Sequence, residues 1–541
     1  MAVNWGGVAG MIVFYLLILA IGLWAARRSR GHGRDTEHAM VGDRGFGWRV
    51  GVLTLISTWV GGGFINGTAE VVFTSGLVWA QAPWGFSLSF VVDAFFFAEK
   101  MRAANYVTMI DPFSIKYGAK MGGILFITAL MGELLWCATI LTALGSTMNV
   151  ILDIDRYLSV IISACVATLY TFVGGLYSVA YTDIAQLTVI FFGLWLCFPF
   201  AVTNSASASI VANSDLWVGE WDNKYVGVWL DNALLLIMGG VPWQAYFQRA
   251  LASKSPRHVK YMTLVASAGC IIVSLPAYLM GAVGATTDWS AVQINLNRTN
   301  PADDPSIVLP AIIQYLTPPA VAFFGLGAIS AAVMSSTDSS ILSSTSMFVR
   351  NVYRNVFRPK ASDLELMITM KITLVAVAAI ATILALTADS IYSLFVLSGD
   401  VVYVNLFPQL VCVVHMERSN TYGSVLGLIA GLVFRIGGGE PTLNLPPFIY
   451  YPFYNESDGQ LFAFRTLAML CSLVTCIVGS LITDVIFRRG WLDTKWDIFR
   501  CFEDHAGVSD IGAKNTIELQ NDVSNDDKGS VNPAYNSEKG N

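Results

Sequence analysis

Trp59-Val60-Gly61-Gly62-Gly63 interrupts a hydrophobic segment long enough to span a membrane, and Gly239-Gly240-Val241-Pro242-Trp243 interrupts a second one far along the chain. Glycine runs and glycine followed by proline break helices, and lipid cannot satisfy the backbone groups that a break sets free. Such breaks persist where they face protein, water or a ligand, and transporters bind their solutes at breaks that recur in two halves. The two stretches therefore predict a transporter.

Composition places the whole chain in the membrane. The 541 residues are 55% hydrophobic and 13% charged, against about 25% charged in soluble domains. Apolar segments recur from residue 8 to about residue 487, and at roughly 20 residues per span they predict about thirteen transmembrane helices in an all-α integral membrane protein. No stretch is basic enough for nucleic acid, and we expect the lipid bilayer to be a partner.

The order of the segments predicts an internal repeat. After the first span, the predicted spans form two groups of five and a final pair. Each group of five begins with a broken helix, and because five is an odd number the second group is inverted in the membrane relative to the first. The predicted parts are a first helix with a basic cytoplasmic loop (1–45), repeat 1 (46–203), an outer loop (204–226), repeat 2 (227–416), two further helices with an outer loop (417–488) and a tail (489–541). The polar tail predicts a disordered cytoplasmic segment with possible trafficking partners.

Basic residues set the orientation. Arg27, Arg28, Arg30 and Arg34 follow the first span, and basic loops stay in the cytoplasm. The N-terminus is therefore predicted to be extracellular and the C-terminus cytoplasmic. The other predicted inner loops are also basic, and they include the stretches Lys100 to Lys120, Arg249 to Lys260 and Arg350 to Lys360. The sequons at Asn297 and Asn455 fall in predicted outer loops, where glycosylation is possible.

A serine-rich helix offers ligands for sodium. Ala332, Ser335 and Ser336 lie at i, i+3 and i+4, so that one carbonyl and two hydroxyls share a face. The carbonyls of Ser57 and Val60, freed where the first break begins, would complete an oxygen site. The alternative is that small residues only allow close helix packing. The glycine-rich break favours the sodium site.

Acids at membrane depth are costly and are functional by default. Asp183 and Asp338 could each bind a second sodium ion or hold a gate. Asp93, Glu133 and Asp400 also lie near membrane depth, and for them a satisfied polar contact between helices is as well supported as a function.

Aromatic residues point to an organic cation. Each break carries a tryptophan, Trp59 or Trp243, while Trp136 lies in mid-span and Phe86 follows a Gln-Ala-Pro-Trp-Gly stretch. Ring faces attract a cation that cannot donate a hydrogen bond, such as a quaternary ammonium. Ordinary packing is the alternative for Trp136 and Phe86. The breaks carry no Arg or Lys, which argues against an anionic substrate. The sequence contains no set of residues in a catalytic arrangement, so we do not expect an enzyme.

Four stretches resemble the choline carriers of the sodium/solute symporter family. They are Thr58 to Glu70, Val173 to Asp183 (Val-Gly-Gly-Leu-Tyr-Ser-Val-Ala-Tyr-Thr-Asp), Gly240 to Arg249 (Gly-Val-Pro-Trp-Gln-Ala-Tyr-Phe-Gln-Arg) and Ala331 to Leu342. The second and fourth patterns are shared with sodium-coupled sugar, iodide and proline carriers, whereas the first and third are more specific. The resemblance runs from about residue 8 to residue 487.

The resemblance implies a LeuT-like 5+5 inverted-repeat core and sodium- and chloride-dependent choline uptake at the plasma membrane. It also implies a supply of choline for acetylcholine synthesis, at presynaptic terminals and on synaptic vesicles. It assigns sodium to Ser57, Val60, Ala332, Ser335 and Ser336, and choline to Trp59, Trp136 and Trp243.

The resemblance gives Glu440, an outer-loop acid, a modulatory role. Phe86 departs from the tyrosine that is usual in the family. Because the ring face is kept and a hydroxyl is lost, we expect cation selectivity to persist while affinity differs.

Two alternatives stay open. One is a sodium symporter of the same fold for another small solute, and the other is a choline sensor that does not transport. A sensor would need a signalling domain, and the residues after Arg489 are too few and too polar to form one.

Overall fold

The computed structural model describes residues 5–29, 40–152, 154–171, 176–292, 300–387 and 390–502. Within these ranges the chain is helical, and its extended pairings are isolated bridges such as Phe46 with Ser253. Residues Met1–Leu481 make up one compact unit and Ile482–Asn541 make up another. The sequon at Asn297, residues 172–175 of the Val173 to Asp183 stretch, and residues 503–541 of the predicted tail lie outside the described residues.

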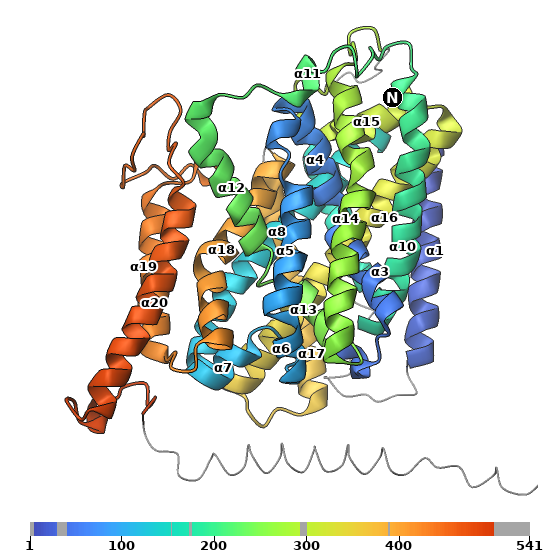
Figure 1. Cartoon of the computed structure of the whole chain (residues 1–541). Coiled ribbons are helices and arrows are strands. Elements are labelled where there is room, and N and C mark those ends of the chain that lie inside the picture. The colour runs from blue at the N-terminus through green and yellow to red at the C-terminus, as the bar shows by residue number, and fades with distance from the viewer. Residues whose placement is uncertain are drawn as a thin grey trace, which may run out of the picture. The chain divides into compact units, whose positions relative to one another are not determined.

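The helices follow one another without a strand between them in the described ranges (Figure 1). The first half contains α1 (Trp5–Ser29), α3 (Trp48–Trp59), α4 (Gly62–Thr74), α5 (Ala82–Phe96), α6 (Ala98–Ala103), α7 (Asp111–Tyr117), α8 (Ala119–Leu152), α9 (Arg156–Thr171) and α10 (Leu176–Val202). The rest contains α11 (Asp215–Val218), α12 (Val226–Gly239), α13 (Gln244–Leu251), α14 (Pro256–Ala285), α15 (Val308–Leu316), α16 (Pro319–Met347), α17 (Asp363–Leu386), α18 (Ile391–His415), α19 (Thr421–Gly437) and α20 (Phe464–Arg488).

The membrane character is confirmed, while the number of spans is not. Among the described residues eight helices are long and apolar enough to cross a membrane, or nine if the bent pair α3 and α4 is one span. Helices α5, α9 and α19 have 15, 16 and 17 residues, short of the roughly 20 that a straight span needs. Thirteen spans therefore stays a prediction.

The first predicted break is present between α3 and α4, which are bent by 50°. Val60 and Gly61 leave the helical conformation there, with ψ angles of 67° and −178°. A Cβ atom on Gly61 would lie 1.7 Å from Ser336 Oγ, and one on Gly62 would lie 2.0 Å from Val333 Cγ2. The glycines are required because α16 packs directly against the break.

The second break separates α12 from α13. Helix α12 ends at Gly239, α13 begins at Gln244, and Pro242 between them has no N–H to continue the helix. A Cβ atom on Gly240 would lie 2.6 Å from Ser89 Oγ, and one on Gly239 would lie 2.6 Å from the Gly399 carbonyl oxygen. This break therefore packs against both α5 and α18.

Burial separates a central set of helices from a peripheral one. In the apolar 18-residue stretch of each spanning helix, 83% of the residues are buried in α16 and α18 and 78% in α8, whereas only 33% are buried in α17 and α20. Large apolar side chains such as Ile372 and Ile383 of α17 are exposed, as a lipid-facing helix requires. The serine-rich α16 is thus central, and it packs against α1, α8 and α10.

The connecting segments gather at two ends. One end holds α6 and α7 (Figure 1). There Arg102 of α6 donates from Nε to the Ser253 carbonyl (2.7 Å), and the neighbouring Ala252 carbonyl accepts from Phe46 N–H (3.1 Å). At the other end the Tyr225 hydroxyl donates to Asp458 (2.9 Å). The loops at these two ends are those that the sequence predicts on opposite sides of the membrane. Which end faces the cytoplasm stays a prediction.

Candidate substrate and sodium site

The four predicted aromatic side chains lie together in the core. The ring centroid of Trp59 is 5.6 Å from Phe86, 6.1 Å from Trp136 and 6.1 Å from Trp243. Trp136 and Trp243 are 5.7 Å apart, and each of the four side chains is at most 3% exposed. Both breaks, α5 and α8 therefore contribute to one aromatic cluster, called the cage below.

Two further rings extend the cage. Phe395 on α18 lies 4.8 Å from Trp136 and 4.9 Å from Phe86, and Phe90 lies 5.1 Å from Trp59. Both residues lie in ordinary apolar stretches of their helices, α18 and α5. Nothing in the sequence distinguishes them from the other phenylalanines, and only the packing of α5 and α18 reveals them.

The cage has ring faces and two free donors. The indole N–H groups of Trp59 and Trp243 have no hydrogen-bond partner among the described residues, although a buried indole usually finds one. The rings are in contact with one another. A cation binds to a ring face at up to about 6 Å from the ring centroid, so two rings must move apart before a cation can lie between their faces. The cluster can offer a cation its faces and a substrate oxygen its N–H groups.

The predicted sodium ligands meet where α3 ends. The hydroxyl oxygens of Ser57 and Ser335 lie 2.8 Å apart, and the Ser335 hydroxyl oxygen is also 3.2 Å from the Ser57 carbonyl oxygen. The Ser336 hydroxyl donates to the carbonyl of Thr58 at 3.3 Å. Gly61, next to Val60, faces both Ser336 and the Ala332 carbonyl. The end of α3 and the middle of α16 thus form one oxygen-rich contact. The carbonyl of Thr58 is part of it, although Thr58 is not among the sodium ligands predicted from the sequence.

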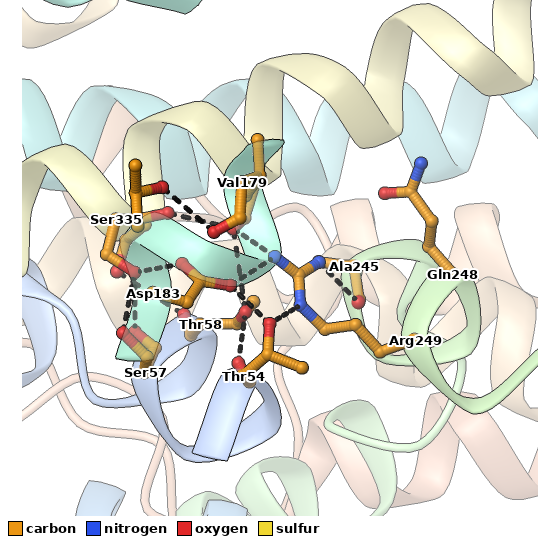
Figure 2. A network of polar contacts seen from close by, with 12 residues as sticks. Thr54, Ser57, Thr58, Val179, Asp183, Ala245, Gln248, Arg249 and Ser335 are labelled. Carbon is orange, nitrogen blue, oxygen red and sulfur yellow. Dashed lines mark hydrogen bonds and ion pairs between the residues drawn. The ribbon is translucent and has the colours of Figure 1, made fainter. Parts of the chain in front are cut away.

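Figure 2 shows Asp183 joined to this contact. The Ser335 hydroxyl donates to Asp183 Oδ1 at 2.6 Å, and the Thr54 hydroxyl donates to Oδ2. Arg249 Nη2 lies 3.1 Å from Oδ2, and both charged side chains are fully buried. The carboxylate, predicted as a ligand of a second sodium, already has a cation beside it.

Arg249 was the unforeseen member of this network. The sequence predicts Arg249 at the start of an inner loop and shows no basic residue at the breaks, but the structure buries Arg249 in α13, directly after the second break. Its guanidinium also donates to Thr54 Oγ1 at 3.1 Å and to Ser339 Oγ at 2.5 Å. The one available signal was that a buried aspartate needs a partner. Because Asp183 balances its charge, Arg249 adds no net positive charge.

The remaining acids differ in their partners. Asp338 is buried on α16, three residues after Ser335, and its sodium role stays a prediction. Glu133 accepts a hydrogen bond from the Ser340 hydroxyl at 2.7 Å, and Asp400 accepts one from Arg435 Nε at 2.6 Å. Asp93 is fully buried, and neither carboxylate oxygen has a hydrogen-bond partner among the described residues.

Glu440 belongs to a buried cluster of four charges at the end that carries Tyr225 and Asp458. It pairs with Arg435 and lies 4.0 Å from Arg465, which in turn is 3.2 Å from Asp400. Burial by itself would raise the pKa of Glu440, but Arg465 and Arg435 together hold it below its ordinary value. Glu440 also lines a cavity of about 220 Å³ between α12 and the segment that leads to α20.

Known proteins resemble the chain over most of its length. It is 49% identical to the High-affinity choline transporter 1 of Drosophila melanogaster over 504 residues, which cover 92% of this chain and 82% of the relative. It is also 49% identical to the High affinity choline transporter 1 of Homo sapiens, over 92% of this chain and 89% of the relative.

A solved structure shows the same fold. A Na+-coupled sialic acid symporter in a substrate-bound outward-open state superposes with a TM-score of 0.70 at 16% identity, over 88% of this chain and 98% of that one. This match supports a LeuT-like helical core. Residues 40–431 match the Sodium:solute symporter family. The chain therefore belongs to the sodium:solute symporter family, whose members are transporters and not enzymes.

Proposed function

We propose that the chain takes up choline across the plasma membrane by alternating access, driven by the sodium gradient. The observation that carries this proposal is the cage: rings from both breaks, α5, α8 and α18 converge beside the oxygen-rich contact of α3 and α16. A quaternary ammonium has no N–H to donate, so ring faces can bind it where a hydrogen-bonding site could not. The names of the relatives, which are choline transporters, support the same substrate.

Sodium would couple to choline through the end of α3. Ser57 and Val60 flank Trp59 in the chain, so an ion held by Ser57, Val60, Ala332, Ser335 and Ser336 fixes the backbone that carries a cage ring. Sodium would therefore favour the state in which Trp59 is positioned for choline. A ligand shifts an equilibrium by its differential affinity for the two states, and this arrangement supplies such a difference.

The hydroxyl of choline would bind at the free indole donors. Trp59 Nε1 and Trp243 Nε1 are buried without partners among the described residues, and an unmade buried hydrogen bond costs about 1–3 kcal/mol. Choline brings one hydroxyl oxygen at a distance of two carbons from its ammonium group. The cage thus has a feature for each end of the substrate.

Further parts of the proposal rest on the family resemblance. We include chloride as a co-substrate, a supply of choline for acetylcholine synthesis, and a location at presynaptic terminals and synaptic vesicles. Arg102, Lys116 and Arg350 lie at one end, and basic residues mark the cytoplasmic side of a membrane protein. With this end in the cytoplasm, the N-terminus is extracellular and the C-terminus is cytoplasmic. Glycosylation occurs at Asn455 or Asn297, and the tail after residue 488 binds trafficking partners.

Uptake of labelled choline into cells expressing the chain tests the proposal. We expect saturable uptake in sodium that is lost in lithium, with inhibition by choline analogues and none by glucose, proline or iodide. Absence of choline uptake by protein shown to reach the surface would contradict it. Transport of one of the competitors instead would favour a symporter for another small solute, and binding without transport would favour a sensor.

A further inference from the structure

Asp93 differs from the other acids at membrane depth. Glu133, Asp183 and Asp400 each have a hydroxyl or arginine partner. Asp93 is 0% exposed, and neither of its carboxylate oxygens has a hydrogen-bond partner among the described residues. Because an unpaired carboxylate in a bilayer is costly, such residues mark ion or substrate pathways. The carboxylate of Asp93 therefore has hydrogen-bond acceptors that a cationic ligand could satisfy.

The position of Asp93 on α5 relates it to the cage. Seven residues separate it from Phe86, which is about 20° short of two full helical turns, so both side chains leave the same face of α5. Ser89 and Phe90 lie between them on that face, and both are buried. The exposed side chains of α5, Leu88, Phe95 and Phe96, lie on other faces.

Helix α13 runs past the same face. Gly240 lies against Phe86 and Ser89, and Tyr246 lies further along, with its ring 5.2 Å from Phe90. The Tyr246 hydroxyl is in electrostatic range of the Asp93 carboxylate. The order from the cage is therefore Phe86, then the Phe90 and Tyr246 pair, then Asp93, about 10 Å from Phe86 along the helix axis.

This order points toward α6, at the end of the molecule assigned to the cytoplasm (Figure 1). We propose that Asp93 forms a second, inner binding position for the substrate cation, which receives the quaternary ammonium after it leaves the aromatic cage. Phe90, which extends the cage, pairs with Tyr246 on the side toward Asp93, and the two rings offer faces between the two positions. The inference rests on the proposed function, because the ligand is the ammonium group of choline.

The inner position should be specific for charge. The cage binds through ring faces, whereas the Asp93 carboxylate ionises beside the ammonium group and then attracts it as an opposite charge in a region of low dielectric. A suitable probe is 3,3-dimethyl-1-butanol, which has the shape of choline with a carbon atom in place of the nitrogen. The preference for choline over this neutral analogue isolates the contribution of the carboxylate.

The test compares Asp93→Asn with wild type in right-side-out and inside-out vesicles that contain the full chain. At the inner face we expect the half-saturating choline concentration to rise at least about tenfold in Asp93→Asn. The half-saturating concentration of 3,3-dimethyl-1-butanol at the inner face should stay unchanged. At the outer face both half-saturating concentrations and the sodium activation curve should match wild type. Glu133→Gln, which removes a buried but partnered acid, is the matched control and should leave the inner preference intact.

An unchanged inner-face preference in Asp93→Asn, while wild type takes up choline, would overturn the inference and leave the proposed function standing. An equal loss in Glu133→Gln would also overturn it, because the effect would then belong to any buried acid. Wild type without choline uptake would overturn the proposed function itself. Since Asp93→Asn removes an unpaired charge, we expect normal folding, and the melting temperature in detergent checks this.

Discussion

Arg249 Nη2 lies 3.1 Å from Asp183 Oδ2, and neither side chain has any exposed surface. The pair joins α13, which follows the second break, to α10, and through Thr54 and Ser335 it reaches α3 and α16. One buried ion pair thus connects the two broken segments.

Removing one member of this pair should damage the protein more than removing both. Asp183→Asn leaves a buried guanidinium and Arg249→Met leaves a buried carboxylate, and breaking such a pair costs about 3–5 kcal/mol. The double variant leaves no net charge, so it should melt above either single variant in detergent. Additive losses would show that the pair is not coupled.

Trp243→Ala should weaken choline uptake sharply while the protein still reaches the surface. Trp243 is 2% exposed and contacts both Trp59 and Trp136, and loss of its ring removes about 1–2 kcal/mol of cation–π attraction in a desolvated site. The half-saturating choline concentration measures the effect. Trp48→Ala, at an exposed tryptophan, is the control. Unchanged uptake in Trp243→Ala would remove this ring from the site.

Ser336→Ala should raise the sodium concentration that supports half-maximal uptake. The Ser336 hydroxyl reaches across to α3 at Thr58, whereas the Ser344 hydroxyl, two turns further along α16, donates within its own helix to the Ser340 carbonyl. Ser344→Ala is therefore a matched control in the same helix. Sodium activation curves of the two variants decide the point, and an unshifted curve for Ser336→Ala would exclude this ligand.

Phe86→Tyr should increase affinity for choline without changing cation selectivity. The tip of the Phe86 ring faces Gly399, where an added Cβ atom would lie 3.6 Å from Phe86 Cζ, so the tyrosine hydroxyl would point to a part of α18 that carries no side chain. One further hydrogen bond to the substrate contributes about 1 kcal/mol, or roughly a fivefold lower half-saturating concentration. Equal or weaker affinity would show that the hydroxyl finds no substrate group.

Glu440 should contribute stability that does not vary across physiological pH. Its pKa is below the ordinary value because of Arg465 and Arg435, against the opposing effect of burial. The stabilisation is thus fully present above the unfolded pKa of about 4.3 and is lost as pH falls through the lower folded pKa. Glu440→Gln should lower the melting temperature equally at about pH 7.5 and pH 5.5. A difference that shrinks within this window would contradict the lowered pKa.

The sequence predicted what local pattern controls. Glycine and proline fix the breaks at Gly61 and Pro242, and helical spacing places Ser335 and Ser336 on one face. Both breaks are present in the structure, and Trp59, Phe86, Trp136 and Trp243 lie together, while their role in binding choline stays a prediction.

Tertiary partners could not be predicted in the same way. Arg249 looks like the start of a basic inner loop until α10 places Asp183 beside it. Phe395 becomes a cage residue only because α18 packs against α8. Asp93 has no hydrogen-bond partner among the described residues, and this depends on every neighbour of α5 at once, which no local pattern encodes.

The most direct test of sodium-coupled choline transport uses the purified chain in liposomes with an imposed sodium gradient. We expect labelled choline to accumulate above its external concentration and the accumulation to collapse when the gradient is dissipated. Ser336→Ala should require more sodium for the same rate. Choline that only equilibrates across the membrane, at a rate indifferent to sodium, would contradict the coupling between the α3–α16 contact and the cage.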